Sequence, residues 1–486
     1  MKTSTDTYRN SFLNRFKVSE EDLHKLVDTA LKHGGSYCDL YFEDTSYTDI
    51  LLRDSSVATG GLCTDYGCGI RVLDGEKTGY AYTESTDMPS LLKAAAAASS
   101  IVSSPGADRL PTPGYCGRPN MAASRYRAEA DWEADGLSAF APYLGRLEKA
   151  VRGRDSRVRK VVANLANSRS EILMYNSFDQ LTWDSRPLAS LSVTVVFEQS
   201  RDGQVQTETR NCSRSFRMGA EMLSDALLEE IATDLTEGID ERFEAQRPKG
   251  GEMPVVMGAG ASGILLHEAM GHAFEADFNR KGQSVFSGRI GERICRKGIT
   301  IVDDGTIRSN RGAVNFDDEG VPGQRTVMVE DGVLTGYLHD RISAGFYGVK
   351  PTGNGRRESF RYYPIPRMRA TYMENGTGGL TCKELISGVK KGIFVDRFSN
   401  GQVKIGEGDF TFFVKSGFLI ENGRLTMPVK DINIIGNGPE ALADISAVAS
   451  DLRVDNGAWT CGKGQSVPVS CGIPSVLIDN LTVGGQ

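Results

Sequence analysis

Glycine is the residue that most constrains how this chain can fold. The sequence holds 55 glycines among 486 residues, which is about 11% where about 7% is usual. Prolines number only 17, so the excess does not indicate low complexity. It predicts many tight turns between strands. After residue 330, short apolar segments alternate with glycines, at 332–340, 392–398, 408–429 and 475–483. This pattern favours a barrel or a folded-over antiparallel sheet.

The first half of the chain reads as a mixture of helices and antiparallel strands. Residues 20–33 predict a helix, because Ser19 and Asp22 form a capping box and Gly34 can end it. Residues 36–45 and 48–60 alternate like strands. Residues 67–84 predict a hairpin that turns at Asp74 and Gly75. Further helices are predicted near 144–152 and over 219–243, and further strands over 158–177 and 186–200.

A break rich in proline and glycine at 246–254 predicts the main domain boundary. The chain then divides into an α+β region at 1–247, with antiparallel sheets, and a strand-rich, barrel-like domain at 248–486. A second proline- and glycine-rich stretch suggests a subdivision of the first region near 105–125. The fold class expected for the whole chain is α+β.

Composition argues against several classes of protein. The net charge is −7, whereas nucleic-acid binders usually show a basic surplus. The N-terminus has no apolar core typical of a signal peptide. No stretch reaches the roughly 18 apolar residues of a membrane span. The nine cysteines form no dense framework, which favours a reducing, cytoplasmic setting. We therefore expect neither nucleic acid nor a membrane as a partner.

Two of the five histidines lie together in the segment HEAMGH, at positions 267 and 272. The surrounding residues 264–278 are apolar almost all round, which predicts a buried helix. Ionisable groups are costly to bury unless they are paired or bind a metal. The alternative is two buried histidines that hydrogen-bond to the backbone.

The spacing of these histidines conflicts with a regular helix. Residues i and i+5 lie about 140° apart at 3.6 residues per turn. Two imidazoles at that angle cannot reach one ion at a Zn–N distance near ~2.0–2.1 Å. A π-type bulge would bring them onto one face. We therefore predict a helical irregularity around Met270 to His272, with Gly271 absorbing the distortion.

A catalytic zinc site usually has three protein ligands and an open position. Several residues could supply the third ligand: Glu275, Asp277, His339, Cys461 and Cys471. Cys461 stands out because it lies in a glycine-rich turn, where a loop could present a thiolate. A single buried cysteine is nevertheless more often a small apolar filler.

Two weaker motifs compete for a function. Gly258, Gly260 and Gly263 form a GxGxxG pattern, which can bind a dinucleotide when it lies between a strand and a helix. No clear second parallel strand ending in an acidic residue follows it, so a glycine-rich turn is a sufficient explanation. Arg356 and Arg357 lie beside glycines and could bind an anion such as a peptide carboxylate. They could equally belong to a solvated turn.

Longer motifs across the chain resemble the TldD/PmbA metallopeptidase family, in its catalytic TldD-like branch. The helix resembles the family's HExxxH segment. Other blocks that are similar to the family's signatures are GCGIRVLDGEKTGYA, PTGNGRRESF, PIPRMRATYM, KDINIIGNGPEAL, WTCGKGQSVPV and LTVGGQ. The resemblance spans most of the chain. It departs in two places: the family commonly has one more residue between Lys463 and Gly464, and Ala273 and Ala276 lie where glycines are expected.

The resemblance implies a zinc-dependent peptidase with one Zn²⁺ per active subunit. It implies His267, His272 and Cys461 as the metal ligands and Glu268 as the general base. It also implies a barrel-like C-terminal domain and a dimer, with itself or with a TldE/PmbA-like paralogue, whose joined halves enclose the active site. Such a cavity suits short or unfolded peptides. The alternative is a non-catalytic peptide-binding or assembly subunit of a TldD/TldE-type complex.

Overall fold

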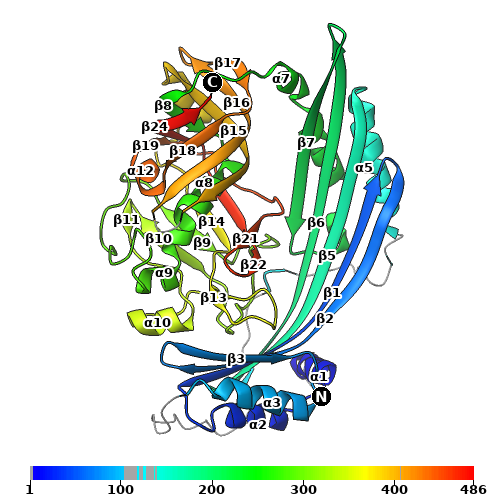
Figure 1. Ribbon diagram of the computed structural model, residues 1–486, viewed down its shortest axis with the longest axis vertical. Helices are drawn as coiled ribbons and strands as arrows, with labels where there is room; N and C mark the ends of the chain where they lie inside the picture. Colours follow the sequence, from blue (N-terminus) through cyan, green and yellow to red (C-terminus); the bar gives the residue numbers. More distant parts are fainter. Residues whose placement is uncertain are drawn as a thin grey trace.

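The structure is a computed structural model that describes residues 4–102, 118–119, 124–126, 136, 139–404 and 407–485. A long, curved sheet from the first half of the chain lies beside a strand-rich domain from the second half (Figure 1). Most of the stretch 105–125, where the sequence suggests a subdivision, lies outside the described residues. The α+β class is confirmed.

One antiparallel sheet dominates the first half of the chain. Its strands follow the order β3-β2-β1-β5-β6. β7 pairs antiparallel with β6, whereas the short β4 pairs with β6 in parallel. The strands are β1 (Tyr37–Arg53), β2 (Ser56–Asp74), β3 (Lys77–Thr83), β4 (Arg118–Pro119), β5 (Val158–Asn176), β6 (Gln180–Arg201) and β7 (Gln204–Phe216). The sheet therefore runs through the whole first half.

The turns of this sheet differ in detail from the sequence prediction. β1 is one continuous strand, so segment 36–45 and the start of segment 48–60 belong to the same strand. The chain reverses at Asp54 and Ser55, both at positive φ, as a two-residue hairpin turn requires. The β2–β3 turn lies at 75–76 rather than 74–75, because Asp74 still pairs with Lys77 in the ladder.

Helices cover this sheet in two groups. α1 (Ser4–Phe16), α2 (Glu20–Ala30) and α3 (Met88–Ser99) lie at the lower end, around the N-terminus, and α5 (Ala141–Arg154) lies along the upper part (Figure 1). The predicted capping box is confirmed: Ser19 and Asp22 exchange hydrogen bonds at the start of α2. The helical stretch predicted at 219–243 is divided into η2 (Ala220–Met222), α6 (Asp225–Thr236) and α7 (Ile239–Glu244).

The predicted barrel is present in the second half. Because β15 pairs with β16 as well as with β8, five strands close into a ring in the order β15-β8-β24-β18-β16. They are β8 (Gly251–Met257), β15 (Lys391–Val403), β16 (Asp409–Glu421), β18 (Asn433–Asn437) and β24 (Val476–Gly484). β17 (Arg424–Val429) and β19 (Ile445–Val448) add to the same sheet. Closure leaves these five strands without a free edge.

A second sheet lies below the barrel, in the order β11-β10-β9-β14-β23-β20. Its strands are β9 (Ile301–Asp304), β10 (Arg325–Glu330), β11 (Val333–Leu334), β14 (Ala370–Met373), β20 (Arg453–Val454) and β23 (Ser470–Ile473). Two-stranded ladders and short helices complete the domain: β12 (Gly355–Arg356), β13 (Ile365–Pro366), β21 (Thr460–Gly462), β22 (Ser466–Pro468), α10 (Arg341–Tyr347), α11 (Cys382–Ser387) and α12 (Gly438–Ala443). In the described residues, no helix has the length and apolar character needed to cross a lipid bilayer.

Buried charges join the two halves of the molecule. Arg71 of the long sheet bonds Asp39 beside it and Glu319 of the C-terminal domain, the latter at 2.7 Å. Glu43 accepts the backbone N–H of Phe360 at 2.7 Å. Removing one partner of a buried ion pair leaves the other uncompensated. These contacts therefore fix the orientation of the long sheet against the domain that carries the candidate site.

Close packing explains the GxGxxG pattern. A Cβ at Gly263 would lie 2.6 Å from the backbone nitrogen of Gly472 in β23, closer than any real Cβ contact. Gly260 has a φ of +93° and donates its N–H to the carbonyl of Ile473. The strand before the pattern belongs to the barrel. The glycines thus allow the helical segment to lie directly on β23, and no dinucleotide is needed to explain them.

Replacing Gly263 by alanine should therefore destabilise the protein by about 1–3 kcal/mol, as overpacking in a tight core does. The midpoint of urea unfolding measures the change. Gly145→Ala in α5 is the matched control, because among the described residues nothing beyond the adjacent residues and backbone of the same helix lies within 4 Å of the added Cβ, and alanine is favoured in a helix by about 0.5–1 kcal/mol. Equal midpoints for the two variants would contradict the packing explanation.

Candidate metal centre

The helical segment between β8 and α9 (Ala276–Arg280) is irregular. It passes through η3 (Ala261–Gly263), α8 (Ile264–Leu266), η4 (His267–Gly271) and η5 (His272–Phe274). η4 is a single π-helical turn, and η5 is 3₁₀. The predicted irregularity around Met270 to His272 is confirmed, and it begins at His267. The extra residue in the turn returns i and i+5 to one face.

Gly271 contributes space to this turn rather than unusual backbone freedom. Its φ of −59° and ψ of −45° are ordinary helical values. A Cβ at this position would lie 2.1 Å from the sulfur of Met368, which is fully buried. The prediction that Gly271 absorbs the backbone distortion is therefore wrong in its mechanism, because the glycine makes room for Met368.

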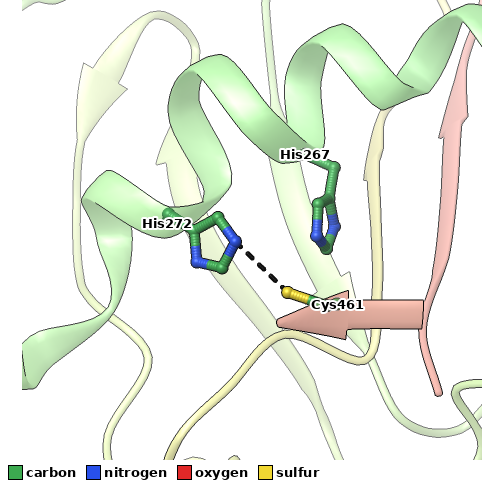
Figure 2. A group of neighbouring side chains, drawn as sticks. All are labelled: His267, His272 and Cys461. Carbon is green, nitrogen blue, oxygen red and sulfur yellow. Dashed lines mark hydrogen bonds between the residues drawn. The ribbon is translucent and has the colours of Figure 1, made fainter. Parts of the chain in front are cut away.

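The π turn directs both histidine rings toward Cys461, which arrives on β21 (Figure 2). The His272 Nε2 atom lies 3.2 Å from the Cys461 sulfur, and the two ring centroids are 5.3 Å apart. One donor atom from each residue lies within 4.8 Å of the other two. All three side chains are buried. This juxtaposition joins residues 189 positions apart in the chain.

His267 has no hydrogen-bond partner for either ring nitrogen within the described part of the chain, although it is only 1% exposed. The alternative of two histidines bonded to backbone therefore does not describe this ring. An unpaired buried polar atom costs about 1–3 kcal/mol. A group that accepts a nitrogen lone pair would remove this cost. The imidazole and thiolate donors of the site suit zinc.

The electrostatics of the site favour a cysteine thiolate. Burial would raise the pKa of Cys461, but the adjacent His267 and His272 rings outweigh it and lower the pKa to about 5. Burial would lower the pKa of His272, but Glu275 and Cys461 raise it to about 10. At neutral pH the pair is therefore a thiolate beside an imidazolium.

The other candidates for a third ligand have different surroundings. Glu275 contacts the Nδ1 atom of His272 at 3.0 Å, so it lies behind the ring. Asp277 accepts a hydrogen bond from Lys463. His339 packs against the rings of Tyr337 and Tyr347, and Cys471 lies in β23, where burial raises its thiol pKa. Within the described residues, only Cys461 joins the two histidines in a group of potential ligands.

Glu268 follows His267 in the π turn and is half-buried. It lies close enough to Cys471 to add to the rise of that thiol's pKa, after burial and Asp455. It is thus directly next to a candidate ligand in the sequence and is not fully buried.

Arg356 and Arg357 are both buried. Arg356 donates to the carbonyls of Met368 and Pro468. Arg357 donates to the carbonyl of Asp318 at 3.0 Å and lies over the ring of Tyr41. These contacts favour a structural role for both arginines.

Sequence reasoning did not identify Lys463 and Arg367 as part of the site. Lys463 is two residues after Cys461 and contacts Glu275. Arg367 is fully buried and donates to the carbonyl of Cys461 at 2.6 Å. Lys463 could have been found from the sequence, because it is a lysine in a glycine-rich turn beside a candidate ligand. No sequence pattern indicates Arg367.

The fold and the site together define a class: an α+β protein whose strand-rich domain brings two histidines and a cysteine together as a candidate metal site. Comparison with known families gives a more specific result. Residues 250–485 match the PmbA/TldA metallopeptidase C-terminal domain, 38–102 match domain 1, and 131–238 match the central domain. This chain belongs to the PmbA/TldD metallopeptidase family.

Individual relatives support the same family assignment. The chain is 38% identical over 489 residues to a metalloprotease TldD homolog of Haemophilus influenzae, covering 98% of each chain. It is 33% identical over 314 residues to a zinc metalloprotease TldD homolog of Saccharolobus solfataricus, covering 64% of this chain and 68% of the relative. The crystal structure of TldE from Thermococcus kodakarensis has the same fold, with a TM-score of 0.72 at 19% identity over 96% of this chain and all of that one.

Proposed function

We propose that this chain is a zinc-dependent peptidase whose zinc site consists of His267, His272 and Cys461. The observation that carries the proposal is the buried His267 ring: among the described residues neither of its nitrogens has a hydrogen-bond partner, and the ring lies beside a histidine–cysteine pair. Family membership supports it, and one relative is named a zinc metalloprotease.

In this proposal each residue has a distinct role. His267 and His272 supply neutral nitrogen donors, and Cys461 supplies a thiolate. A bound Zn²⁺ would polarise the scissile carbonyl and make a water molecule more acidic. Glu268, next to His267, takes the proton of that water and later delivers it to the leaving amine.

We further propose that the substrates are short or unfolded peptides, cleaved in a cavity enclosed by a dimer. The partner is a second copy of this chain or a TldE/PmbA-like paralogue. A TldE structure shares the fold of this chain, which supports a TldE-like chain as the candidate paralogue. Analytical ultracentrifugation of the chain with and without such a paralogue distinguishes a homodimer from a heterodimer.

Zinc stoichiometry and peptide hydrolysis, measured on the same sample, test the proposal. The purified chain should hold one zinc per active subunit and should cleave an unstructured peptide. Chelation should remove both properties, and one equivalent of zinc should restore both. A chain that takes up no zinc would instead favour a non-catalytic peptide-binding or assembly subunit.

Zinc uptake should depend on pH. His272 must lose its Nε2 proton to bind the metal, and its raised pKa of about 10 means that this proton is still present at pH 7. Cys461, with a pKa of about 5, is already a thiolate. Zinc affinity should therefore rise about tenfold per pH unit between pH 7 and 9, since one proton is displaced. Competition with a chelator of known affinity measures it, and an affinity independent of pH would contradict this electrostatic picture.

A further inference from the structure

The loop that follows Cys461 is a tight turn. β21 and β22 form a hairpin in which Gly462 pairs with Ser466. Three residues, 463–465, connect them. Lys463 donates its N–H to the carbonyl of Gln465, and Gly464 has a φ of +68°, which favours glycine. Within this turn the Lys463 side chain reaches back to the helical segment.

Lys463 contacts the helical segment through two carboxylates. Its ammonium lies 2.9 Å from Glu275 Oε2 and 2.7 Å from Asp277 Oδ1, and it also donates to the carbonyl of Pro366. Only 10% of its side chain is exposed, and that of Glu275 is fully buried. Three donor bonds and near-complete burial make this ammonium a fixed part of the interior rather than a mobile surface charge.

Glu275 in turn contacts the proposed ligand on the helical side. Its Oε2 atom lies 3.0 Å from His272 Nδ1. An ionised carboxylate can only accept, so Nδ1 carries the proton and donates. The Nε2 atom of the same ring then points to Cys461. A carboxylate behind a histidine fixes the ring orientation and the tautomer in metal sites.

Arg367 also holds the hairpin that carries Cys461. Its guanidinium donates to the carbonyl of Cys461 at 2.6 Å and to that of Gln465 at 2.7 Å. The same guanidinium approaches Glu275 Oε1 at 3.8 Å. The buried Glu275 carboxylate therefore connects both halves of the site. These are His272 on the helical segment and Cys461 on the hairpin.

We propose that Glu275 and Lys463 are positioning residues that hold the His272 ring and the Cys461 hairpin together, so that the metal site is assembled before zinc arrives. The proposal rests on the zinc site proposed above. It assigns the two residues no contact with substrate.

Zinc affinity of the full-length chain tests this proposal, with four variants compared. Glu275→Ala removes the acceptor for His272, and Glu275→Gln keeps a neutral acceptor. Lys463→Met removes the ammonium while keeping the length of the side chain. Asp277→Asn is the matched control, because it neutralises a carboxylate bound to the same lysine but out of contact with His272. Chelator competition gives the affinity, and cobalt substitution reports through its thiolate-to-metal absorption whether Cys461 binds.

Glu275→Ala and Lys463→Met should each weaken zinc binding by about 10–100-fold, the usual cost of losing such support. Glu275→Gln should recover part of the loss, and Asp277→Asn should stay within about threefold of the unaltered chain, because Asp277 contacts Lys463 and not His272. If Glu275→Ala binds zinc as tightly as the unaltered chain, or if Asp277→Asn loses as much as Glu275→Ala, the positioning role is overturned. An unaltered chain that binds no zinc overturns the zinc site itself. Unchanged circular dichroism shows that a loss of affinity does not come from unfolding.

Discussion

Replacing Glu268 by glutamine is expected to reduce peptide cleavage by about 10²–10⁴-fold while leaving the zinc content unchanged. That range is the usual contribution of a positioned general base. The amide keeps the size of the side chain but cannot take a proton from water. Glu268 is half-buried and outside the group of three potential ligands, so its replacement leaves the zinc site intact. Steady-state hydrolysis of an unstructured peptide, with zinc measured on the same sample, gives both quantities.

The control for this experiment is Glu292→Gln, an isosteric change at an ion pair with Arg289 in which 54% of the glutamate side chain is exposed. It should leave both cleavage and zinc content unchanged. Retained cleavage in Glu268→Gln would show that another group activates the water. Loss of zinc in the same variant would instead place Glu268 among the ligands.

Replacing Cys461 by alanine is expected to weaken zinc binding by about 10²–10³-fold, since one of the ligands of a tightly held zinc contributes a few kcal/mol. Cleavage should fall with the loss of metal. Zinc should also stop protecting the fold: a ligand at about 1,000 times its Kd stabilises the native state by about 4 kcal/mol. Unfolding midpoints with and without zinc measure this effect in the unaltered chain and in the variant.

Cys471→Ala is the matched control, because Cys471 is buried and was the other cysteine considered as a ligand. It should lower stability modestly through a small cavity and keep the zinc-dependent stabilisation. If Cys471→Ala loses zinc and Cys461→Ala keeps it, the ligand assignment is wrong.

Local sequence features predicted much of the fold. The capping box of Ser19 and Asp22 is present at the start of α2, because such a cap depends only on residues three positions apart. The alternation of apolar residues predicted antiparallel sheets in the first half. The short strands and glycine turns of the second half predicted a barrel or a folded-over sheet, and the structure has the barrel. Turn positions were predicted less accurately. The β2–β3 turn lies one residue later than predicted, because Asp74 still pairs with Lys77 in the ladder.

The five-residue spacing of the two histidines was also sufficient to predict a distorted helix, since a regular one would place the rings about 140° apart. The π turn of η4 has this geometry. The role given to Gly271 was wrong, because the space beside it is set by Met368, nearly 100 residues later, and not by the helix itself.

By itself, the sequence determined the strand alternation, the capped helix and a bent segment that carries two histidines, because each depends on neighbours within one or two turns. Only the tertiary structure decided which of five candidates lies beside those histidines. His272 and Cys461 are 189 positions apart. A chain segment of that length can fold in many ways, and no periodicity in the sequence indicates which candidate it brings to the histidines. The packing of β23 against Gly263 and the short turn after Cys461 bring the sulfur to the rings, and Lys463 reaches Glu275 because of the same turn.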